Sequence, residues 1–214
     1  MIVYGSNVSP YVRKTLAYVA EKGLQAENQP TNPFARDPEF LKISPFSKIP
    51  AFRDGDFAIC DSTAIITYLE AKHPEPPLLP ADPKSRARAV WFEEFADTIL
   101  ITAMGKIFTN RLVAPRFLGR PGDEAVAAAA EKDELPPILD YIERTLPDAG
   151  FLVEDRLTLA DLAVASPFVN LLLLGIRPEP ERLPKTRAYV DRMLARPSFA
   201  PLVAAVMPLA LTPA

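Results

Sequence analysis

The chain has 214 residues, of which 49% are hydrophobic and 24% are charged, a balance typical of a soluble globular protein with a sizeable core. Lysine and arginine total 24 against 27 aspartate and glutamate residues, and the resulting net charge of -3 argues against binding to nucleic acid or to a membrane. The single cysteine, Cys60, and the single histidine, His73, exclude an internal disulfide and a Cys/His zinc site, so we expect no metal cofactor.

The N-terminal residues lack the basic flank and apolar stretch of a signal peptide, so we expect a cytoplasmic protein. The apolar run Ile2–Tyr4 predicts a short strand. A helix follows and ends near Gly23, a typical C-cap residue. Its apolar residues recur at helical spacing, at Val12, Leu16 and Val19.

Two apolar runs, Ala51–Arg53 and Phe57–Ile59, flank Asp54-Gly55-Asp56, and an Asp-Gly pair in that setting predicts a β-hairpin. Asp61 and Ser62 then offer side-chain oxygens that can cap the start of a helix. The apolar positions of this helix are Ile65, Ile66 and Leu69. The first 80 residues are therefore expected to form a mixed α/β domain.

Prolines crowd the segment 73–83, which cannot hold a regular helix and is interpreted as a linker. We predict a domain over residues 1–76, a linker over 77–84 and an all-helical domain over 85–214. In that second domain Thr158 and Asp161 form a predicted capping box. The predicted helices cover 85–117, 123–146 with an interruption at Pro136-Pro137, 158–174 and 184–194.

Several short motifs follow one another along the chain: Ser9-Pro10-Tyr11, Ser47–Ala51, Asp61–Ile65, Thr158–Ala163 and Arg196–Phe199. With the strand, the hairpin and the helical second half, this order resembles the cytosolic glutathione transferase family, of the bacterial type with serine at the thiol-activating position. The resemblance spans the whole chain. It implies an α/β thioredoxin-like N-terminal domain that binds glutathione as co-substrate, an all-α C-terminal domain, and a homodimer.

The resemblance gives Ser9 the role of contacting the glutathione thiol. Lowering a thiol pKa from about 8.5 to about 6.5 requires roughly 2.7 kcal/mol of preference for the anion. A helix N-terminus contributes about 0.3–1 kcal/mol and a hydrogen bond to a charged group about 1.5–3 kcal/mol, so together they suffice. Alternatively Ser9 is only an N-cap, and Ser6 or Tyr11 contacts the sulfur. A serine here forms no mixed disulfide, which favours conjugation over thiol transfer.

The remaining glutathione contacts also follow from the resemblance. Ile49 and a cis-Pro50 would pair with the cysteinyl backbone, whereas an ordinary trans proline is the alternative. Asp61 and Ser62 would hold the γ-glutamyl end. Some family branches hold the glycyl carboxylate with a histidine or lysine in the stretch 32–38, which is missing here. Lys48 or Arg36 would pair with this carboxylate instead.

An apolar pocket for the second substrate is expected at the domain interface. Its predicted lining residues are Tyr11, Trp91, Phe95, Met104 and Phe108. For the aromatic residues at helical spacing, the alternative is a role in the core or in dimer contacts.

These observations predict a glutathione S-transferase that adds the glutathione thiolate to a small apolar electrophile. The same thiolate also serves isomerases, dehalogenases and peroxidases on this fold, and the fold does not choose among them. The competing hypotheses are a non-catalytic protein-interaction module and an apolar-ligand carrier. The interaction-module hypothesis is disfavoured, because a protein that serves only as a scaffold has no need of a charged ligand site. The sequence nevertheless keeps all four residues expected at that site, namely Ser9, Pro50, Asp61 and Ser62.

Overall fold

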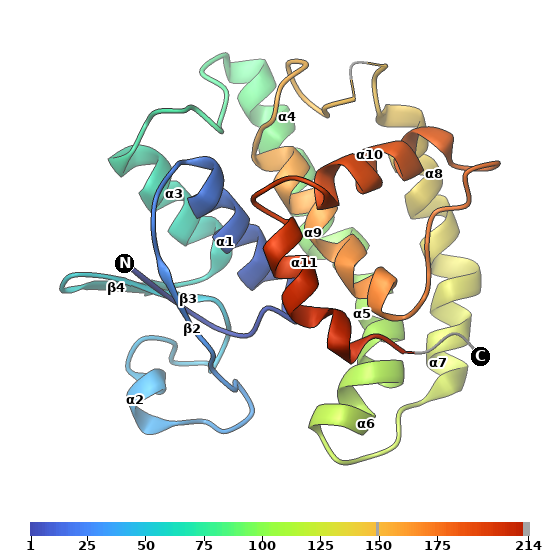
Figure 1. Ribbon diagram of the computed structural model, residues 1–214, viewed down its shortest axis with the longest axis horizontal. Helices are drawn as coiled ribbons and strands as arrows, with labels where there is room; N and C mark the ends of the chain where they lie inside the picture. Colours follow the sequence, from blue (N-terminus) through green and yellow to red (C-terminus); the bar gives the residue numbers. More distant parts are fainter. Residues whose placement is uncertain (149, 212–214) are drawn as a thin grey trace.

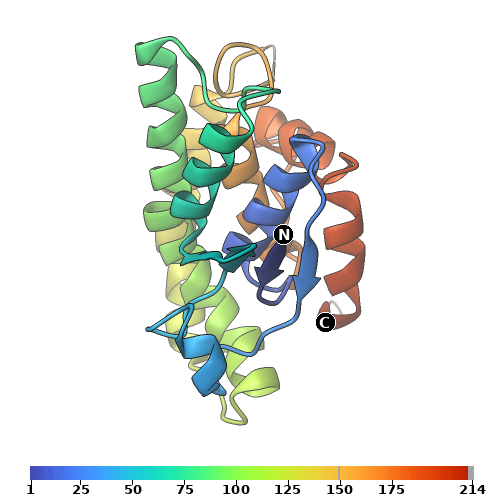
Figure 2. The same cartoon turned by 90° about the vertical axis from the view of Figure 1, so that its left-hand side faces the viewer.

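The computed structural model describes residues 1–148 and 150–211, and begins with a four-stranded sheet at one end of the molecule (Figures 1 and 2). The strand order is β2-β1-β3-β4, with β1 parallel to β2 and antiparallel to β3, and β3 antiparallel to β4. The strands are β1 (Ile2–Tyr4), β2 (Glu27–Gln29), β3 (Ala51–Asp54) and β4 (Phe57–Cys60). This mixed sheet confirms the predicted thioredoxin-like N-terminal half.

Helices α1 (Pro10–Glu21) and α3 (Ser62–Lys72) pack against each other and against the sheet, while the short α2 (Pro38–Leu41) lies in the connection between β2 and β3. Both long helices begin where the sequence predicts, because Ser9 and Asp61 cap them with their side chains. The predicted apolar face of α3 is fully buried, at Ile65, Ile66 and Leu69. The hairpin forms as predicted, with Gly55 at a positive φ of 62° in its turn.

The second half of the chain is helical. Its helices are α4 (Pro83–Glu94), α5 (Ile101–Phe108), α6 (Ala114–Phe117), α7 (Glu124–Ala129), α8 (Leu135–Thr145), α9 (Leu159–Leu173), α10 (Pro184–Leu194) and α11 (Ala200–Val206). Three wider π-helical segments, Phe95–Leu100, Thr109–Val113 and Ala130–Glu134, join α4 to α6 and α7 to α8 without a break. Short π-helical stretches inside longer helices are often found at functional sites.

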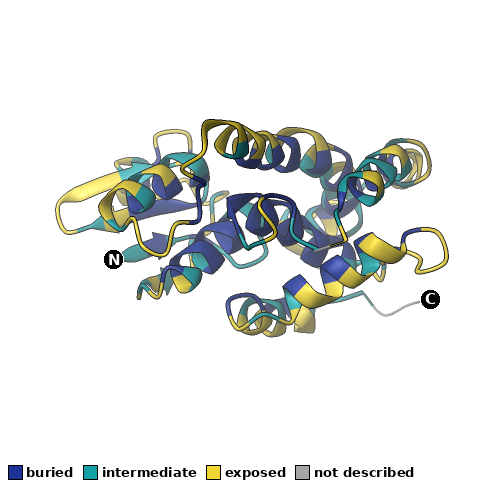
Figure 3. Ribbon diagram, turned by 90° about the horizontal axis from the view of Figure 1, so that it is seen from above, coloured by how far each residue is buried: buried dark blue, intermediate teal, exposed yellow. Residues whose placement is uncertain are grey.

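Helix α9 lies at the centre of the molecule, where Figure 3 shows the buried residues gathered. It is apolar on nearly all sides and packs against both α1 and α4. The predicted capping box is present, since the Asp161 carboxylate accepts a hydrogen bond from the Thr158 N–H at 2.9 Å and both residues are fully buried. The larger of the two hydrophobic clusters in the described part of the chain contains residues of both halves.

The sequence-based prediction is incomplete at β2, α2 and α11. Strand β2 consists of Glu27, Asn28 and Gln29, whose polar side chains show no apolar alternation, so its pairing with β1 defines it. Helix α2 has only four residues, too few for a periodic pattern. The predicted interruption at Pro136-Pro137 is wrong, because the chain stays helical from Glu124 to Thr145. The two prolines cannot donate an amide hydrogen bond, and the wider π-helical turn Ala130–Glu134 directly precedes them.

Helix α3 ends at Lys72 and α4 begins at Pro83, so the proline-rich segment lies between them without a helix or strand. The exact domain limits at 76 and 85 remain predictions. Within the predicted helical domain, residues 149 and 212–214 lie outside the described residues. No helix in the described ranges is long and apolar enough to cross a membrane.

Candidate functional site

A cavity of about 1030 Å³ opens between the two halves of the chain. One wall comes from the loop before α1, the connection between β2 and β3, and the residues before β3. The other wall comes from α5, its π-helical continuation, α6 and two residues of α9. Pockets of roughly 300–1,000 Å³ are typical of small-molecule sites. The cavity therefore has room for two small reactants.

Ser9 lines this cavity at the N-terminus of α1, with Pro10 as the first helical residue. Its hydroxyl oxygen accepts a hydrogen bond from the Val12 N–H at 3.5 Å. Ser6 also lines the cavity, and its hydroxyl oxygen accepts from the Val8 N–H at 3.3 Å. Among the described residues neither serine donates its hydroxyl proton, so either can donate to a ligand.

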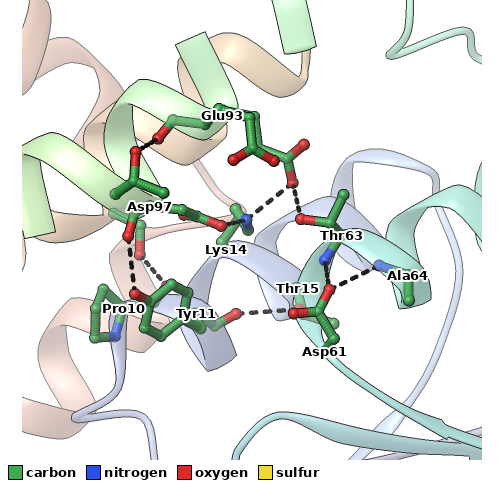
Figure 4. Close-up of polar contacts among 12 residues, drawn as sticks. Pro10, Tyr11, Lys14, Thr15, Asp61, Thr63, Ala64, Glu93 and Asp97 are labelled. Atoms are coloured by element: carbon green, nitrogen blue, oxygen red, sulfur yellow. Dashed lines mark hydrogen bonds and ion pairs between the residues drawn. The ribbon is translucent and has the colours of Figure 1, made fainter. Parts of the chain in front are cut away.

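Tyr11 lines the cavity as well, but its hydroxyl donates to the backbone carbonyl of Asp97 at 3.1 Å (Figure 4). Burial raises the pKa of Tyr11 to about 12, and the negative charges of Asp97 and Asp61 add to the rise. The phenol therefore stays protonated at neutral pH, and its proton is already directed to the helical half.

Arg13 fixes the loop that carries both serines, a role that the sequence did not reveal. It is fully buried and donates to the backbone carbonyls of Asn7 at 2.6 Å, Val8 at 3.1 Å and Ser166 at 2.8 Å, and also to the side chain of Asn170. Burial lowers the pKa of Arg13 to about 9, so it is charged at neutral pH. The contacts join α1 to its preceding loop and to α9.

The Ile49-Pro50 peptide is cis, as the resemblance implies. Ile49 lines the cavity, and in the described part of the chain its backbone N–H and C=O make no hydrogen bond. The preceding residue, Lys48, is held through its backbone, whose N–H donates to the Ser44 hydroxyl at 2.8 Å. Ile49 therefore offers one donor and one acceptor to an extended ligand. Pro50 is buried beneath the surface of the cavity rather than lining it.

Asp61 and Ser62 lie at the start of α3, beside the cavity but outside its lining. One carboxylate oxygen of Asp61 caps the helix, accepting from the N–H groups of Thr63 at 2.9 Å and Ala64 at 3.0 Å (Figure 4). Asp61 also donates its own N–H to the Pro50 carbonyl at 3.2 Å. This bond ties the start of α3 to the cis peptide, and the exposed second oxygen of Asp61 is open to a cation.

Behind these residues lies a buried charge cluster that joins the two halves (Figure 4). The Lys14 ammonium contacts the carboxylates of Glu93 at 3.0 Å and Asp97 at 2.5 Å. The same Glu93 oxygen accepts from the Thr63 hydroxyl at 2.8 Å. Burial raises the pKa of Asp97, although Lys14 opposes the rise. The cluster links α1, α3 and the end of α4.

Lys48 and Arg36 line the cavity, both are exposed, and neither forms an ion pair within the described ranges. Among the described residues that line the cavity, none has an acidic side chain. An anionic group can therefore be held at this part of the cavity without repulsion. Among residues 1–148 and 150–211, no group of three or more His, Cys, Asp or Glu side chains is placed to hold a metal ion.

The predicted second pocket is only partly assembled by the structure. Met104 and Phe108 line the cavity together with Tyr11, but Trp91 and Phe95 do not. Both of these aromatic residues face α8 instead: the Trp91 indole N–H donates to the Tyr141 hydroxyl at 3.0 Å, and the Phe95 ring lies 5.0 Å from the Tyr141 ring. Trp91 is half exposed and Phe95 is buried, and neither lies in the wall of this cavity.

The residues that complete the helical wall continue the stripe of Met104 and Phe108. They are Ile101, Gly105, Thr109, Val113 and Phe117. Their spacing of three and four residues is a signal present in the sequence. It identifies one face of a helix but does not tell a cavity wall from a core face, which only the structure separates.

Comparison with known proteins agrees with this architecture. A sequence profile described as the glutathione S-transferase N-terminal domain matches residues 3–77, and one described as the C-terminal domain matches residues 96–197. A curated glutathione S-transferase of Hyoscyamus muticus is 32% identical, covering 93% of this chain and 95% of the relative. Glutathione S-transferase 3 of Zea mays is 33% identical, covering 95% and 93%.

Two solved structures resemble the chain along nearly its full length. A glutathione S-transferase from Rhodospirillum rubrum F11 has a TM-score of 0.85 at 26% identity, covering 94% of this chain and 90% of that one. One from Methylobacterium radiotolerans, in complex with glutathione sulfonate, has a TM-score of 0.77 at 30% identity, covering 94% and 93%.

The fold and the cavity define a two-domain protein that joins a thioredoxin-like half to a helical half. Because both profiles match and the curated relatives align along nearly the whole chain, this chain belongs to the glutathione S-transferase family.

Proposed function

We propose that the chain binds glutathione in the cavity between its two halves and that Ser9 donates a hydrogen bond to the glutathione thiolate. The observation that carries this proposal is the position of the Ser9 hydroxyl, which lies on the cavity at the N-terminus of α1 with its proton uncommitted among the described residues. Helix dipole and hydroxyl together favour the anion. The thiol proton leaves to solvent.

The glutathione backbone would extend along Ile49, whose free N–H and C=O suit antiparallel pairing with the cysteinyl unit. The γ-glutamyl ammonium would meet Asp61, and its carboxylate would meet the Ser62 hydroxyl at the start of α3. The glycyl carboxylate would pair with Lys48 or Arg36, the two cations of the lining.

The thiolate would then attack an apolar electrophile held against the helical wall, forming a carbon–sulfur bond while the leaving group takes the displaced electron pair. Met104 and Phe108 supply that wall, and charged residues line only the opposite side. A detoxifying conjugation in the cytoplasm fits this chemistry.

A homodimer is part of the proposal. Phe46, which lines the cavity, is 82% exposed, and Phe57, Val90 and Ile99 are exposed elsewhere on the surface. Large exposed apolar side chains favour burial against a partner, and a second copy of the chain is the partner that the family implies. Sedimentation equilibrium tests this part of the proposal: a single monomeric mass at micromolar concentration would contradict it.

Steady-state kinetics with glutathione and 1-chloro-2,4-dinitrobenzene tests the reaction. Replacing Ser9→Ala removes the proposed donor, and kcat/KM should fall about 10- to 150-fold, as expected for a hydrogen bond to a charged group worth about 1.5–3 kcal/mol. Ser6→Ala is the matched control on the same loop and should retain at least half of the wild-type value. Equal losses in both variants, or no loss in Ser9→Ala, would contradict the assignment to Ser9.

A further inference from the structure

Gly105 is an unusual residue for its place in the fold. It lies inside α5, with four helical residues before it and three after. Glycine is among the poorest helix formers, because it loses more backbone freedom on folding than any other residue. A glycine in the middle of a helix therefore has a reason elsewhere in the structure or in the function.

The two usual structural reasons are absent at Gly105. Its backbone does not have a positive φ, unlike Gly55 or Gly119. No other chain segment approaches it closely: apart from its two chain neighbours and the backbone of its own helix, a Cβ placed there would meet no atom of the described residues within 4 Å. Gly122 shows the contrast: a Cβ at that position would lie 1.7 Å from the carbonyl oxygen of Asn110. The packing of the described chain thus permits a side chain at position 105.

The open space beside Gly105 is the cavity itself. Gly105 lies on the lining stripe, one helical turn from Ile101 and one from Thr109, with Met104 and Phe108 beside it. The other lining residues of that stripe all have side chains, whereas Gly105 has none and leaves open space beside it. A larger residue there would fill part of the cavity on its apolar side.

We propose that Gly105 is a specificity-determining residue, which keeps the apolar wall open for an electrophile with a long or broad apolar group. This inference rests on the proposed function. The lining stripe runs from Ile101 to Phe117, and a rise of about 1.5 Å per residue makes it roughly 24 Å long. An elongated alkyl chain or a fused aromatic ring system fits such a wall, whereas a small electrophile uses little of it.

The test uses S-alkylglutathiones as probes, with methyl, butyl, hexyl and octyl chains, titrated by calorimetry into the full-length protein. In the wild type, Kd should fall with chain length up to octyl, by at most about fourfold per methylene. In Gly105→Leu the decrease should stop near butyl, so octyl should bind at least tenfold more weakly than to the wild type. S-methylglutathione should bind both proteins equally.

Two further variants separate this role from a helix effect. Gly105→Ala should raise the melting temperature, because alanine is the better helix former and meets no neighbour. Thr102→Leu is the matched control, since Thr102 is exposed on the same helix and lies outside the lining. It should leave the dependence on chain length unchanged.

The outcomes distinguish this inference from the proposed function. If the wild type and Gly105→Leu show the same dependence on chain length while S-methylglutathione binds both, the specificity role is wrong and glutathione binding stands. If glutathione and S-methylglutathione bind neither protein, the proposed function fails. If Gly105→Ala lowers the melting temperature, Gly105 has a structural role and the inference is overturned.

Discussion

The two walls of the cavity are built in different ways. The N-terminal wall, here called the polar wall, combines polar residues such as Ser9 and Lys48 with apolar ones such as Ile49. Hydrogen bonds from Arg13 fix the loop that carries Ser9. The helical wall is an apolar stripe along α5 and its continuation, with one gap at Gly105. In the proposed function, the polar wall would bind glutathione and the apolar wall would select the electrophile by size and shape.

Replacing Arg13 breaks the polar wall and should have the largest effect. Arg13→Met leaves the carbonyls of Asn7, Val8 and Ser166 without their donor, so we expect a loss of about 3–5 kcal/mol in the free energy of unfolding. Chemical denaturation measures this loss. The folded pKa of about 9 and the ordinary value of 12.5 both lie above pH 8, so Arg13 is charged in the folded and the unfolded state and the loss should be the same at pH 6 and pH 8.

The control for this variant is Arg53→Met, since Arg53 is an exposed arginine on β3. Its free energy of unfolding should stay within about 0.5 kcal/mol of the wild type. A comparable loss in both variants, or a marked difference between the Arg13→Met losses at pH 6 and pH 8, would show that Arg13 does not hold the loop as described.

Two replacements of Asp61 separate its capping role from its charge. Asp61→Asn keeps an oxygen for the Thr63 and Ala64 amides, so the melting temperature should change little, while glutathione affinity should fall about 10-fold or more through loss of the charge. Asp61→Ala should lose both, with about 1 kcal/mol of stability. Calorimetry and thermal unfolding measure the two effects. Unchanged affinity in Asp61→Asn would mean that the carboxylate only caps α3.

Tyr11 joins the two walls, and its replacement should have the smallest effect. Tyr11→Phe removes the hydrogen bond to Asp97 and should lower stability by about 0.5–1.5 kcal/mol. The apparent pKa values of the pH–rate profile between pH 5 and 9 should not move, because the phenol has a pKa of about 12 and stays protonated throughout. A shift of that profile by one unit would instead indicate that Tyr11 contacts the thiol.

The same contrast explains what the sequence could predict. Local signals predicted the elements of the N-terminal half: a capping serine before a proline, an acidic residue and a serine at a helix start, and an Asp-Gly hairpin. The residues of each motif interact with partners only a few positions away, so the motif can be recognised from the sequence alone. Arg13 was missed because its acceptors Ser166 and Asn170 are more than 150 positions away in the chain.

The apolar wall was predicted only in part, because a helical stripe does not reveal what it faces. Met104 and Phe108 line the cavity, whereas Trp91 and Phe95 pack toward α8. All four are large apolar residues of the predicted helix over 85–117, and the sequence alone does not separate the two pairs. Gly105 was overlooked for the opposite reason: its contribution is the absence of a side chain, which composition and periodicity do not register.

The central claim is that Ser9 stabilises the glutathione thiolate, and the most direct test is the pKa of the bound glutathione thiol. Thiolate absorbance, at roughly 240 nm, is measured against pH in the wild type, Ser9→Ala and Ser6→Ala. We expect a thiol pKa of about 6.5 in the wild type and in Ser6→Ala, and a rise of about 1–2 units in Ser9→Ala. A bound thiol that titrates near about 8.5 in the wild type, or identically in all three proteins, would contradict the assignment of thiolate stabilisation to Ser9.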